Sequence, residues 1–415
     1  MKHRSMTEAF VVLAIGFAAT VAGCGGQSNS SDAMPAPNPT PGEPQLTRTV
    51  VMSGLNSPWD LAFTPDGAML FTEKCRGLSV RLADGTVRRL FGTSGSAVVA
   101  SDLFCEGQSG VNGVAIDPDF ASNRFVYVYM ASNADGAKTN RVVRLTVDSG
   151  YTTVSARTDI VTDIAFKSVG NAWGGAGSHS GGRIRFGPVD GFLYVTTGDN
   201  HNGPLPQDLT RLGGKVLRID RNGAAAPGNN TPAGGDARIY TYGHRNVQGI
   251  AFRPTTGEPF SCEHGPGHSD EVTPLVAGGN GGWDPKPEPG VSCADNYCGY
   301  ISNKSDGSPT PMTDTAKFPQ ALAPSWTNNG RSQGMGPCTF LNGAQWKDWN
   351  GRLAVSLMAA TRLDILTLDA AGMATTVKTA PGLPSQRIRS LMEGPDGALY
   401  VATDGGEIWR LTPHS

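Results

Sequence analysis

A histidine stands between small residues in AGSHSGGRIRFGP, residues 176–188, directly before an alternating strand pattern. A free imidazole has a pKa of about 6.5, so its neutral form can accept a proton at neutral pH. Because no bulky neighbour in the sequence covers His179, we expect it to lie uncovered and to face a cavity. The surrounding GSHSG is not a nucleophile elbow, since its central residue is histidine rather than serine, and this argues against an esterase.

Two further groups of side chains could do chemistry. EHGPGHSDE, residues 263–271, gathers carboxylates and imidazoles that are compatible with a transition metal. Its central Gly-Pro-Gly excludes the helical spacing of an HExxH motif, and a bent, oxygen-rich segment suits calcium better, because backbone carbonyls can serve as ligands. Arg387 and Arg389 are separated by one residue, so on a strand they point the same way and can form forked contacts with carboxylates.

An internal repeat supplies the scaffold that must bring these side chains together. Each copy reads as an apolar strand, a Pro/Asp/Gly turn, a second apolar strand and a third strand that ends in Arg-Leu or similar. The copies lie at residues 59–85, 112–148, 181–220, 248–266, 338–369 and 388–411. Such a sheet cannot bury its apolar face alone, so the copies must stack radially. We expect an all-β, six-bladed β-propeller with four-stranded antiparallel blades. The alternative, a β-solenoid, has shorter repeats.

The turn prolines align the copies and predict a polar ring. The residues nine positions before five of these prolines are Asn56, Ser109, His179, Arg245 and Gln386. Their polar neighbours are Gln108, Asn246 and Arg387. In a propeller these positions begin the innermost strand of each blade, so we expect them to converge on one mouth of the central channel. The alternative for each single residue is an ordinary solvated turn.

The segments outside the repeats indicate an exported protein. We expect residues 1–24 to form a lipoprotein signal peptide, because a short apolar run ends in VAGC, which resembles a bacterial lipobox with Cys24. A plain secreted protein with an incidental cysteine is the alternative. Residues 25–45 are expected to be a disordered tether, and residues 46–415 the propeller, with a loop insertion at about 265–337. These features place the protein in the bacterial cell envelope, anchored by lipid and facing the periplasm or the exterior.

The remaining cysteines and the charge balance narrow the function further. An even six cysteines in an exported chain indicate disulfides. Cys293 and Cys298 can close a local loop, and the other pairings stay open. The net charge is −2 and Lys and Arg are scattered, which argues against a nucleic-acid partner and is compatible with a small neutral substrate.

The motifs together resemble the soluble pyrroloquinoline quinone (PQQ)-dependent sugar dehydrogenases, the glucose/sorbosone dehydrogenase family that includes aldose sugar dehydrogenases. The match runs from about residue 50 to 412 and rests on SPWDLAFTPDG, EGQSGVNGVAIDPDF, HSGGRIRFGP, LGGKVLRID, YGHRNVQGIAF, EHGPGHSDE and RIRSLMEGPDGALY. The resemblance implies oxidation of an aldose-type sugar that depends on PQQ and Ca²⁺, with an external electron acceptor.

The resemblance also implies residue roles. His179 is similar to the family's general base, which takes the hydroxyl proton as hydride leaves the same carbon for the quinone. The residues similar to those that contact the quinone oxygens and the reacting centre are Gln108, Arg245 and Asn246. The residues similar to the pair that binds the cofactor carboxylates are Arg387 and Arg389. The residues whose carbonyls resemble the calcium ligands are Gly265 and Pro266.

The sequence departs from the family in three places. Met358 or Ala359 stands where the family usually has a lysine, which removes one cofactor contact, and Arg362 is a candidate substitute. His264, which we count among the cofactor-binding residues, stands where glucose-active members have glutamine, and Ser178 where some have aspartate. Cofactor affinity and substrate choice therefore stay open.

Two other functions compete with the dehydrogenase. A lipid-anchored propeller that has lost the cofactor and binds a ligand or a protein is favoured by the missing lysine, and fold alone does not decide function. A lactonase-type hydrolase would need an acidic calcium cage in the channel, and the polar ring supplies no such carboxylates.

Overall fold

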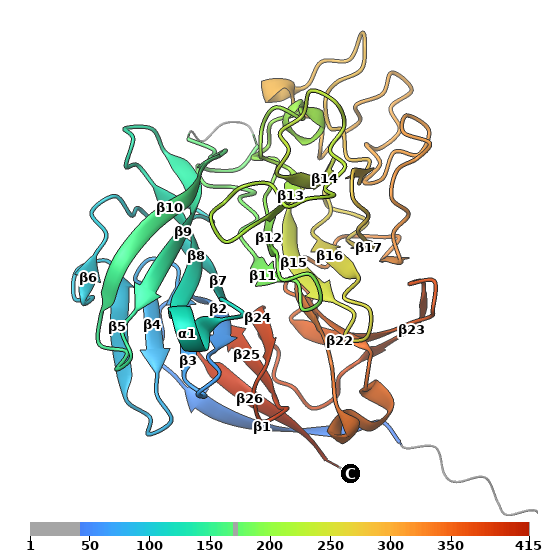
Figure 1. Ribbon diagram of the computed structural model, residues 1–415. Coiled ribbons are helices and arrows are strands. Elements are labelled where there is room, and N and C mark those ends of the chain that lie inside the picture. The colour runs from blue at the N-terminus through green and yellow to red at the C-terminus, as the bar shows by residue number, and fades with distance from the viewer. Residues whose placement is uncertain (1–41, 169–172, 415) are drawn as a thin grey trace, which may run out of the picture. The chain divides into compact units, whose positions relative to one another are not determined.

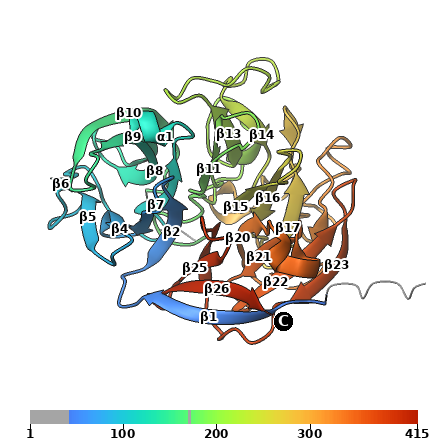
Figure 2. The same ribbon diagram turned by 60° about the horizontal axis from the view of Figure 1, so that its bottom comes forward.

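Six antiparallel sheets surround a common axis in the computed structural model, which describes residues 42–168 and 173–414 (Figures 1 and 2). The six-bladed all-β propeller predicted from the repeats is confirmed, and each copy of the repeat falls in one blade. The predicted signal peptide and most of the predicted tether lie outside the described residues. No helix in the described part of the chain is long and apolar enough to cross a membrane.

The blades are numbered here in chain order, and in each the innermost strand comes first. The strands of blade 1 are β2 (Pro58–Phe63), β3 (Met69–Glu73), β4 (Gly77–Arg81), β5 (Val87–Gly92) and β6 (Val98–Val99). Those of blade 2 are β7 (Val111–Ile116), β8 (Phe125–Ser132), β9 (Thr139–Val147) and β10 (Val154–Ile164). Those of blade 3 are β11 (Ile184–Phe186), β12 (Leu193–Thr196), β13 (Lys215–Ile219), β14 (Ile239–Tyr242) and β18 (Gly279–Asn280).

The other three blades complete the ring. Blade 4 consists of β15 (Val247–Phe252), β16 (Pro259–Glu263), β17 (Glu271–Pro274) and β19 (Trp326–Thr327). Blade 5 consists of β20 (Met335–Phe340), β21 (Leu353–Leu357), β22 (Arg362–Leu368) and β23 (Ala374–Thr379). Blade 6 consists of β24 (Ile388–Glu393), β25 (Leu399–Thr403), β26 (Ile408–His414) and β1 (Gln45–Met52). The short helices are α1 (Phe120–Asn123), η1 (Leu205–Gln207), η2 (Ala294–Asn296) and η3 (Ala344–Trp349).

Two blades differ from the predicted four antiparallel strands. In blade 1 the short strand β6 pairs parallel to β5, and in blade 3 β18 pairs parallel to β14. Both additional strands are two residues long and lie at the outer edge of the blade. They form where the polypeptide passes the outer edge a second time. The repeat pattern could not predict them, because two residues carry no alternation.

The ring is closed by the two ends of the described chain. β1 pairs antiparallel with β26, from Gln45 opposite His414 to Met52 opposite Ile408. Figure 2 shows β1 lying beside β26 at the outside of blade 6. The outermost strand of the last blade thus comes from the start of the fold, so neither end can leave without opening the ring.

The tight turns form where the repeat places Pro, Asp and Gly. In Thr64-Pro65-Asp66-Gly67 the amide of Gly67 donates to the carbonyl of Thr64, and Gly67 has φ +86°, a left-handed conformation that glycine adopts without strain. Each hairpin therefore turns at a position that the sequence marks, which sets the register of the flanking strands.

The apolar core lies between blades rather than at the axis. Six buried clusters each join one pair of neighbouring blades; for example, Leu70 and Val80 of blade 1 pack with Val128 and Leu145 of blade 2. This is the radial stacking expected of sheets that cannot bury both faces alone. Because apolar side chains fill the spaces between the blades, the axis is left for polar residues.

The six cysteines within the described residues are all paired. The disulfides are Cys75–Cys105, Cys262–Cys338 and Cys293–Cys298. The predicted local pair 293–298 is confirmed, and the other two connectivities were open at the level of sequence. Cys262–Cys338 links β16 of blade 4 to β20 of blade 5, so it joins neighbouring blades covalently.

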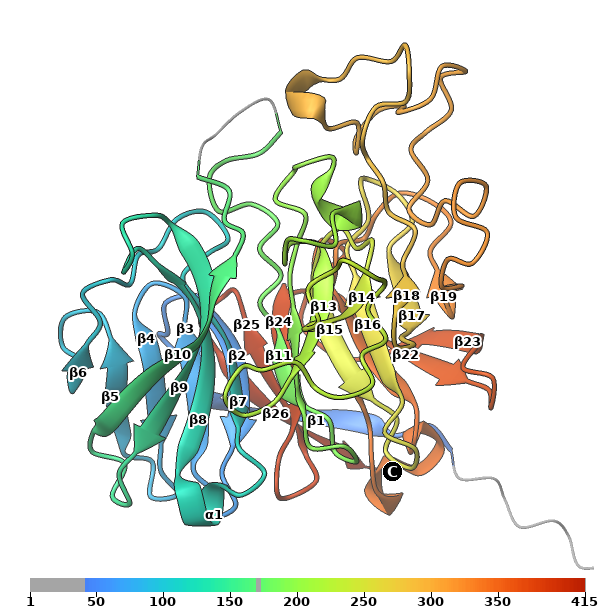
Figure 3. The ribbon, with the colours of Figure 1, turned by 45° about the horizontal axis from the view of Figure 1, so that its top comes forward.

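The stretch 265–337 was expected to be a loop insertion, and part of it is strand. It contributes β17 and β19 to blade 4 and β18 to blade 3. Figure 3 shows its long loops, in yellow and orange, rising above one end of the strands. A seventh cluster of Trp283, Tyr297 and Met312 holds these loops together. The insertion thus covers one mouth of the propeller.

Candidate functional site

A cavity of about 420 Å³ lies at the mouth that the insertion covers, and the predicted residues meet there. The predicted residues that line it are Gln108, His179, Arg245, Asn246, His264, Gly265, Arg387 and Arg389. They come from blade entries and loops that are as much as 281 residues apart, between positions 108 and 389. The expected convergence on one mouth of the channel therefore holds for these eight residues.

Other predicted positions lie elsewhere. Asn56, Ser109 and Gln386 do not line the cavity, although the polar ring included them. Ser109 is buried with its hydroxyl 2.5 Å from that of Ser180, so it links two blade entries instead of facing the channel. The alignment located the strand entries correctly, but the direction of the side chains differs from one entry to the next. In blade 2 the cavity is lined by Gln108 instead of Ser109, and in blade 6 by Arg387 instead of Gln386.

Two of the predicted cofactor-site residues are placed differently from expectation. Pro266 is buried and is not among the residues that line the cavity. Arg362, the candidate substitute for the missing lysine, donates to Asp364 and to Gln333 outside the cavity. An aspartate two residues along the same strand lies on the same face and captures the guanidinium.

The His179 ring is held by Asp199. Nδ1 lies 2.7 Å from a carboxylate oxygen of Asp199, whose other oxygen accepts from the Trp283 indole at 2.8 Å. The backbone of His179 adopts φ +49° and its amide donates to the side chain of Gln108 at 3.1 Å. With Nδ1–H donating to the carboxylate, Nε2 keeps its lone pair. Burial and the positive charge of Arg245 lower the pKa of His179 well below its ordinary value, so the ring is neutral at neutral pH.

His179 is covered, contrary to the expectation from its small sequence neighbours. Only 4% of the residue is exposed. The ring of His201 lies against it with 3.7 Å between centroids, and the Tyr300 hydroxyl lies 3.4 Å from Nε2. Tyr300 belongs to the insertion, whose position over the mouth could not be read from the residues beside His179.

Arg245 connects the insertion to the site. One guanidinium nitrogen donates to the carbonyl of His264 at 2.6 Å, and another to the hydroxyl of Tyr300 at 2.8 Å. Its amide donates to a carboxylate oxygen of Glu263, whose other oxygen lies 2.9 Å from Nδ1 of His244. Its Nε is buried and has no hydrogen-bond partner among the described residues. Both terminal nitrogens of the guanidinium are thus held, whereas its Nε–H has no partner among the described residues.

The lining of the cavity is strongly cationic. It contains the arginines Arg245, Arg331, Arg387 and Arg389 and, among the described residues, no Asp or Glu. Asp404 approaches from behind, where it accepts from Arg389 at 2.8 and 2.9 Å and from Arg387 at 3.0 Å. Burial by itself would raise the pKa of Asp404, yet the two arginines hold it below its ordinary value, so the carboxylate stays charged and orients them.

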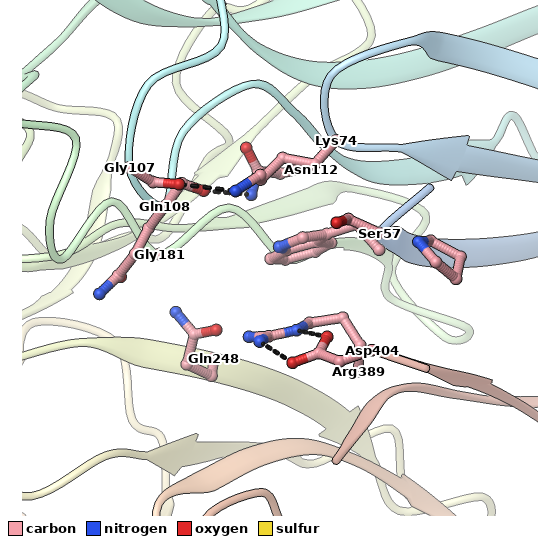
Figure 4. Close-up of a pocket in the computed structure, with 11 residues that line it drawn as sticks. Ser57, Lys74, Gly107, Gln108, Asn112, Gly181, Gln248, Arg389 and Asp404 are labelled. Carbon is pink, nitrogen blue, oxygen red and sulfur yellow. Dashed lines mark hydrogen bonds and ion pairs between the residues drawn. The ribbon is translucent and has the colours of Figure 1, made fainter. Parts of the chain in front are cut away.

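A second hollow of about 260 Å³ adjoins the cavity and shares Gln108, Gln248 and Arg389 with it. Figure 4 shows the Arg389–Asp404 pair on one side of this hollow and Lys74 on the other, donating to the carbonyl of Gly107 at 2.7 Å. Burial and the charge of Arg389 lower the pKa of Lys74. The two hollows therefore share a polar wall, and the second hollow, unlike the main cavity, has one carboxylate in its lining, that of Asp404.

The loop of residues 265–270 is shaped by Asp270. This buried carboxylate accepts from the Gly265 amide at 2.9 Å, the Ser332 hydroxyl at 2.7 Å and the Gln333 amide at 2.6 Å. Among the described residues, no donor bonds the carbonyl oxygens of Gly265 and Pro266. Three or more His, Cys, Asp or Glu side chains do not come together as a metal site anywhere in the described ranges. A cation held here would rely on backbone oxygens.

A buried ion-pair network lies among the inner strands next to the cavity, and the sequence reasoning missed it. Asp60 of β2 binds Arg183 at 2.5 Å and Arg185 at 2.7 Å, and accepts from the hydroxyl of Ser390 at 2.8 Å. Arg183 also donates to the carbonyl of Arg389 at 2.7 Å. The network joins the inner strands of several blades and fixes the strand that carries Arg387 and Arg389.

Sequence reasoning also missed Asp199, His201, Tyr300 and Asp404. Asp199 and Asp404 each follow a strand end, in TTGDN and ATDGG, in copies that carry predicted site residues. Their position in the repeat could have identified these two aspartates as site residues. No sequence pattern could have identified Tyr300, because its segment lies outside the repeat.

Comparison with known proteins finds relatives that match most of the chain. A family model described as Glucose / Sorbosone dehydrogenase matches residues 55–410. Aldose sugar dehydrogenase YliI of Escherichia coli (strain K12) is 30% identical over 379 residues, covering 88% of this chain and 92% of that protein. A structure described as a putative oxidoreductase (glucose dehydrogenase) from Thermus thermophilus has 34% identity and a TM-score of 0.68, covering 88% of this chain and 99% of that one. The PQQ-bound form of an aldose sugar dehydrogenase from Streptomyces coelicolor has 26% identity and a TM-score of 0.67, covering 90% and 100%.

The matched range spans all six blades and includes every residue of the cavity wall named above. With the propeller, the convergent polar residues and the match in hand, the chain belongs to the glucose/sorbosone dehydrogenase family, the soluble PQQ-dependent sugar dehydrogenases.

Proposed function

We propose that this protein oxidises an aldose-type sugar with PQQ as cofactor and His179 as general base. The observation that carries the proposal is a cavity that combines four arginines and no carboxylate with a neutral, oriented imidazole. Membership of a family whose relatives are named sugar dehydrogenases supports the same reaction class.

The residues fit an anionic quinone. PQQ carries carboxylates, which arginine binds through forked, charge-assisted hydrogen bonds, and the volume of about 420 Å³ lies in the range of small-ligand sites. Arg387 and Arg389, held by Asp404, are the carboxylate-binding pair. The unpartnered buried Nε of Arg245 and the amide of Asn246 are available for the quinone oxygens.

Arg331 supplies the cation that the family's lysine would provide. It lines the cavity with Met358 and Ala359, and its own segment is hydrogen-bonded to them: the amide of Met358 donates to the carbonyl of Gly334, and that of Ala359 to Gln333. Within the described ranges Arg331 forms no ion pair with an acidic side chain, so its charge is available to a ligand.

The residues fit calcium through backbone oxygens. Calcium takes six to eight oxygen ligands, and carbonyls are among them. The carbonyl oxygen of Gly265, which lines the cavity, accepts no hydrogen bond from the described residues, and neither does that of Pro266, which lies just outside the lining. The Asp270 contacts hold their loop in shape. The remaining ligands would come from the cofactor and water, and the bound ion would add to the positive charge of the site.

The chain's own groups carry the proton chemistry. When bound, the quinone accepts the hydride that leaves the sugar carbon. Nε2 of His179 accepts the proton of the hydroxyl on that carbon, so the sugar loses a hydride and a proton and becomes the carbonyl product. Asp199 keeps Nδ1 protonated and steadies the imidazolium that forms. The insertion, through Tyr300, limits access of water to the ring.

A cofactor-free binding module is the competing function. One observation favours it: Met358 and Ala359 stand at the position of the family's lysine and carry no charge, so the cation of this wall has to come from Arg331 on another segment. The four arginines and the His179–Asp199 pair oppose it, because a neutral ligand would need neither.

The test adds PQQ and Ca²⁺ to the purified soluble part and measures thermal stability and dye reduction with a panel of aldoses. A bound cofactor raises the unfolding temperature by mass action. We expect this rise for the wild type and for His179→Ala, whereas dye reduction falls by on the order of a hundredfold or more in His179→Ala alone. The absence of both PQQ binding and dye reduction in the wild type would favour the binding module.

We also propose that the protein is exported and held at a membrane of the bacterial envelope through lipid on Cys24. The lipobox-like VAGC supports this location. So do the three disulfides, which persist in oxidising compartments.

A further inference from the structure

The proton taken by His179 must leave before the next sugar can react, and Nε2 is the ring nitrogen from which it leaves. Nδ1 is occupied by Asp199, so the transferred proton sits on Nε2. His179 is buried, and His201 covers one face of its ring. His179 also lines the main cavity, where the sugar or its product lies before the ring. An exit clear of the substrate site therefore passes through a side chain in contact with Nε2.

The Tyr300 hydroxyl is that group. It lies 3.4 Å from Nε2 of His179 and 3.0 Å from Nε2 of His201. Arg245 donates to the Tyr300 oxygen at 2.8 Å, so the phenol already accepts one hydrogen bond, and its own proton is free to point at an imidazole. One hydroxyl thus bridges the base and a second histidine.

His201 stands in the wall between two hollows. It lines a hollow of about 310 Å³ with Asn200, Asn202 and others, and His179 and Tyr300 do not line that hollow. His201 in turn does not line the main cavity, although its ring contacts residues that do. Its Nδ1 is buried and has no hydrogen-bond partner among the described residues, while its amide donates to Asp199 at 2.9 Å. Burial and a charge on His179 lower the pKa of His201 to about 2, so an imidazolium formed there would pass its proton on rather than hold it. The ring has one nitrogen beside the phenol and one nitrogen without a partner among the described residues, as a transfer group needs.

We propose that the proton leaves His179 through the Tyr300 hydroxyl to His201 and then enters the water of this third hollow. The inference rests on the proposed sugar oxidation with His179 as base. His179 gives its Nε2 proton to the phenol oxygen while the phenol gives its own proton to Nε2 of His201, and the resulting imidazolium releases one proton to water. No electrons move in these steps. Rotation of the hydroxyl and exchange of the remaining imidazole proton with water restore the starting arrangement.

The experiment uses the PQQ-loaded protein with an excess of dye and compares the variants His201→Asn and Tyr300→Phe. We expect kcat to fall about tenfold or more in both, while PQQ binding and KM change little, because the lost step is a proton transfer. Added imidazole is expected to restore part of the kcat of His201→Asn, since a small base can take up the proton in place of the missing side chain. Tyr400→Phe, which removes a phenol that bonds Asp396 on blade 6, is the matched control and keeps the wild-type kcat with or without imidazole.

The outcomes separate the two proposals. If the wild type oxidises sugar and both variants turn over at the wild-type rate, the proton route is wrong and the dehydrogenase stands. If added imidazole does not restore any of the kcat that His201→Asn loses, His201 has a packing role and the proton route is wrong as well. If the wild type binds no PQQ, the proposed function fails and the route falls with it. Tyr300→Phe removes one oxygen atom only, so it keeps the test open if His201→Asn does not fold.

Discussion

At the scale of single residues, burial has the largest effect on the protonation states of the histidines in the site. His179 is a weak base in water, and the cavity does not make it a stronger one, since burial and nearby cations lower its pKa. The benefit is a ring that stays neutral and holds one tautomer, because Asp199 fixes the proton on Nδ1. His264, in the same wall, has its pKa lowered to about 4 by burial and Arg245, so neither imidazole adds charge at neutral pH.

This environment predicts the pH dependence of the reaction. The proposed base, His179, must be neutral to accept a proton, so kcat/KM for the sugar should rise with pH through the pKa of His179 and then level off. Because that pKa is lowered, the rising limb lies below pH of about 6.5, the ordinary value for histidine. A pH profile of kcat/KM on the PQQ-loaded protein measures it. A rising limb with its midpoint above the ordinary histidine value would contradict the assignment.

At the scale of elements, the innermost strands carry the site, and buried charge holds them in place. Asp60 binds Arg183 and Arg185, and through Arg183 it reaches the strand that carries Arg389. Burial by itself would raise the pKa of Asp60, but the charges of the two arginines lower it, so the carboxylate is ionised inside the ring of strands.

Asp60→Asn is expected to destabilise the fold by about 3–5 kcal/mol, because it leaves a buried guanidinium without its counter-charge. Urea unfolding followed by fluorescence measures the free energy of unfolding. Asp396→Asn, which breaks the half-exposed pair with Arg410, is the matched control and should cost at most about 1 kcal/mol. Equal costs for the two variants would show that the network contributes no more than a surface pair.

At the scale of the whole molecule, the propeller joins segments from its entire length at one mouth. The ring is closed by β1 and β26, a disulfide links blades 4 and 5, and the insertion covers the mouth with Tyr300. This closed architecture holds the site through contacts within the described residues.

The site and the proposed lipid anchor should therefore be separable. Cys24→Ser is expected to move the protein from the membrane fraction to the soluble fraction, because it removes the thiol proposed to accept the lipid. The PQQ-dependent activity per molecule should stay as in the wild type. Fractionation by detergent phase separation, with dye reduction measured in each fraction, tests both statements. Retention of the variant in the membrane fraction would contradict lipid attachment at Cys24.

Much of the fold could be predicted from the sequence because its signals are local and repeat. Each turn marked by Pro, Asp and Gly sets the register of a hairpin, and six copies of one pattern require radial stacking. The same alignment located His179, Arg245 and the neighbours Gln108, Asn246 and Arg387. It failed for Ser109, because which residue of a strand entry faces the channel depends on the local path of the chain rather than on its position in the repeat.

The sequence by itself determined the six-bladed architecture, the family and most of the cationic wall, since these follow from periodicity and from motifs that each lie within a short stretch. Only the tertiary structure decided the partners of those residues. Asp199 beside His179, Asp404 behind the two arginines, the Asp60 network and the cover formed by Tyr300 and His201 depend on contacts between segments far apart in the chain. No local pattern encodes such contacts, because they arise when sheets close into a ring and an insertion outside the repeat lies over its mouth.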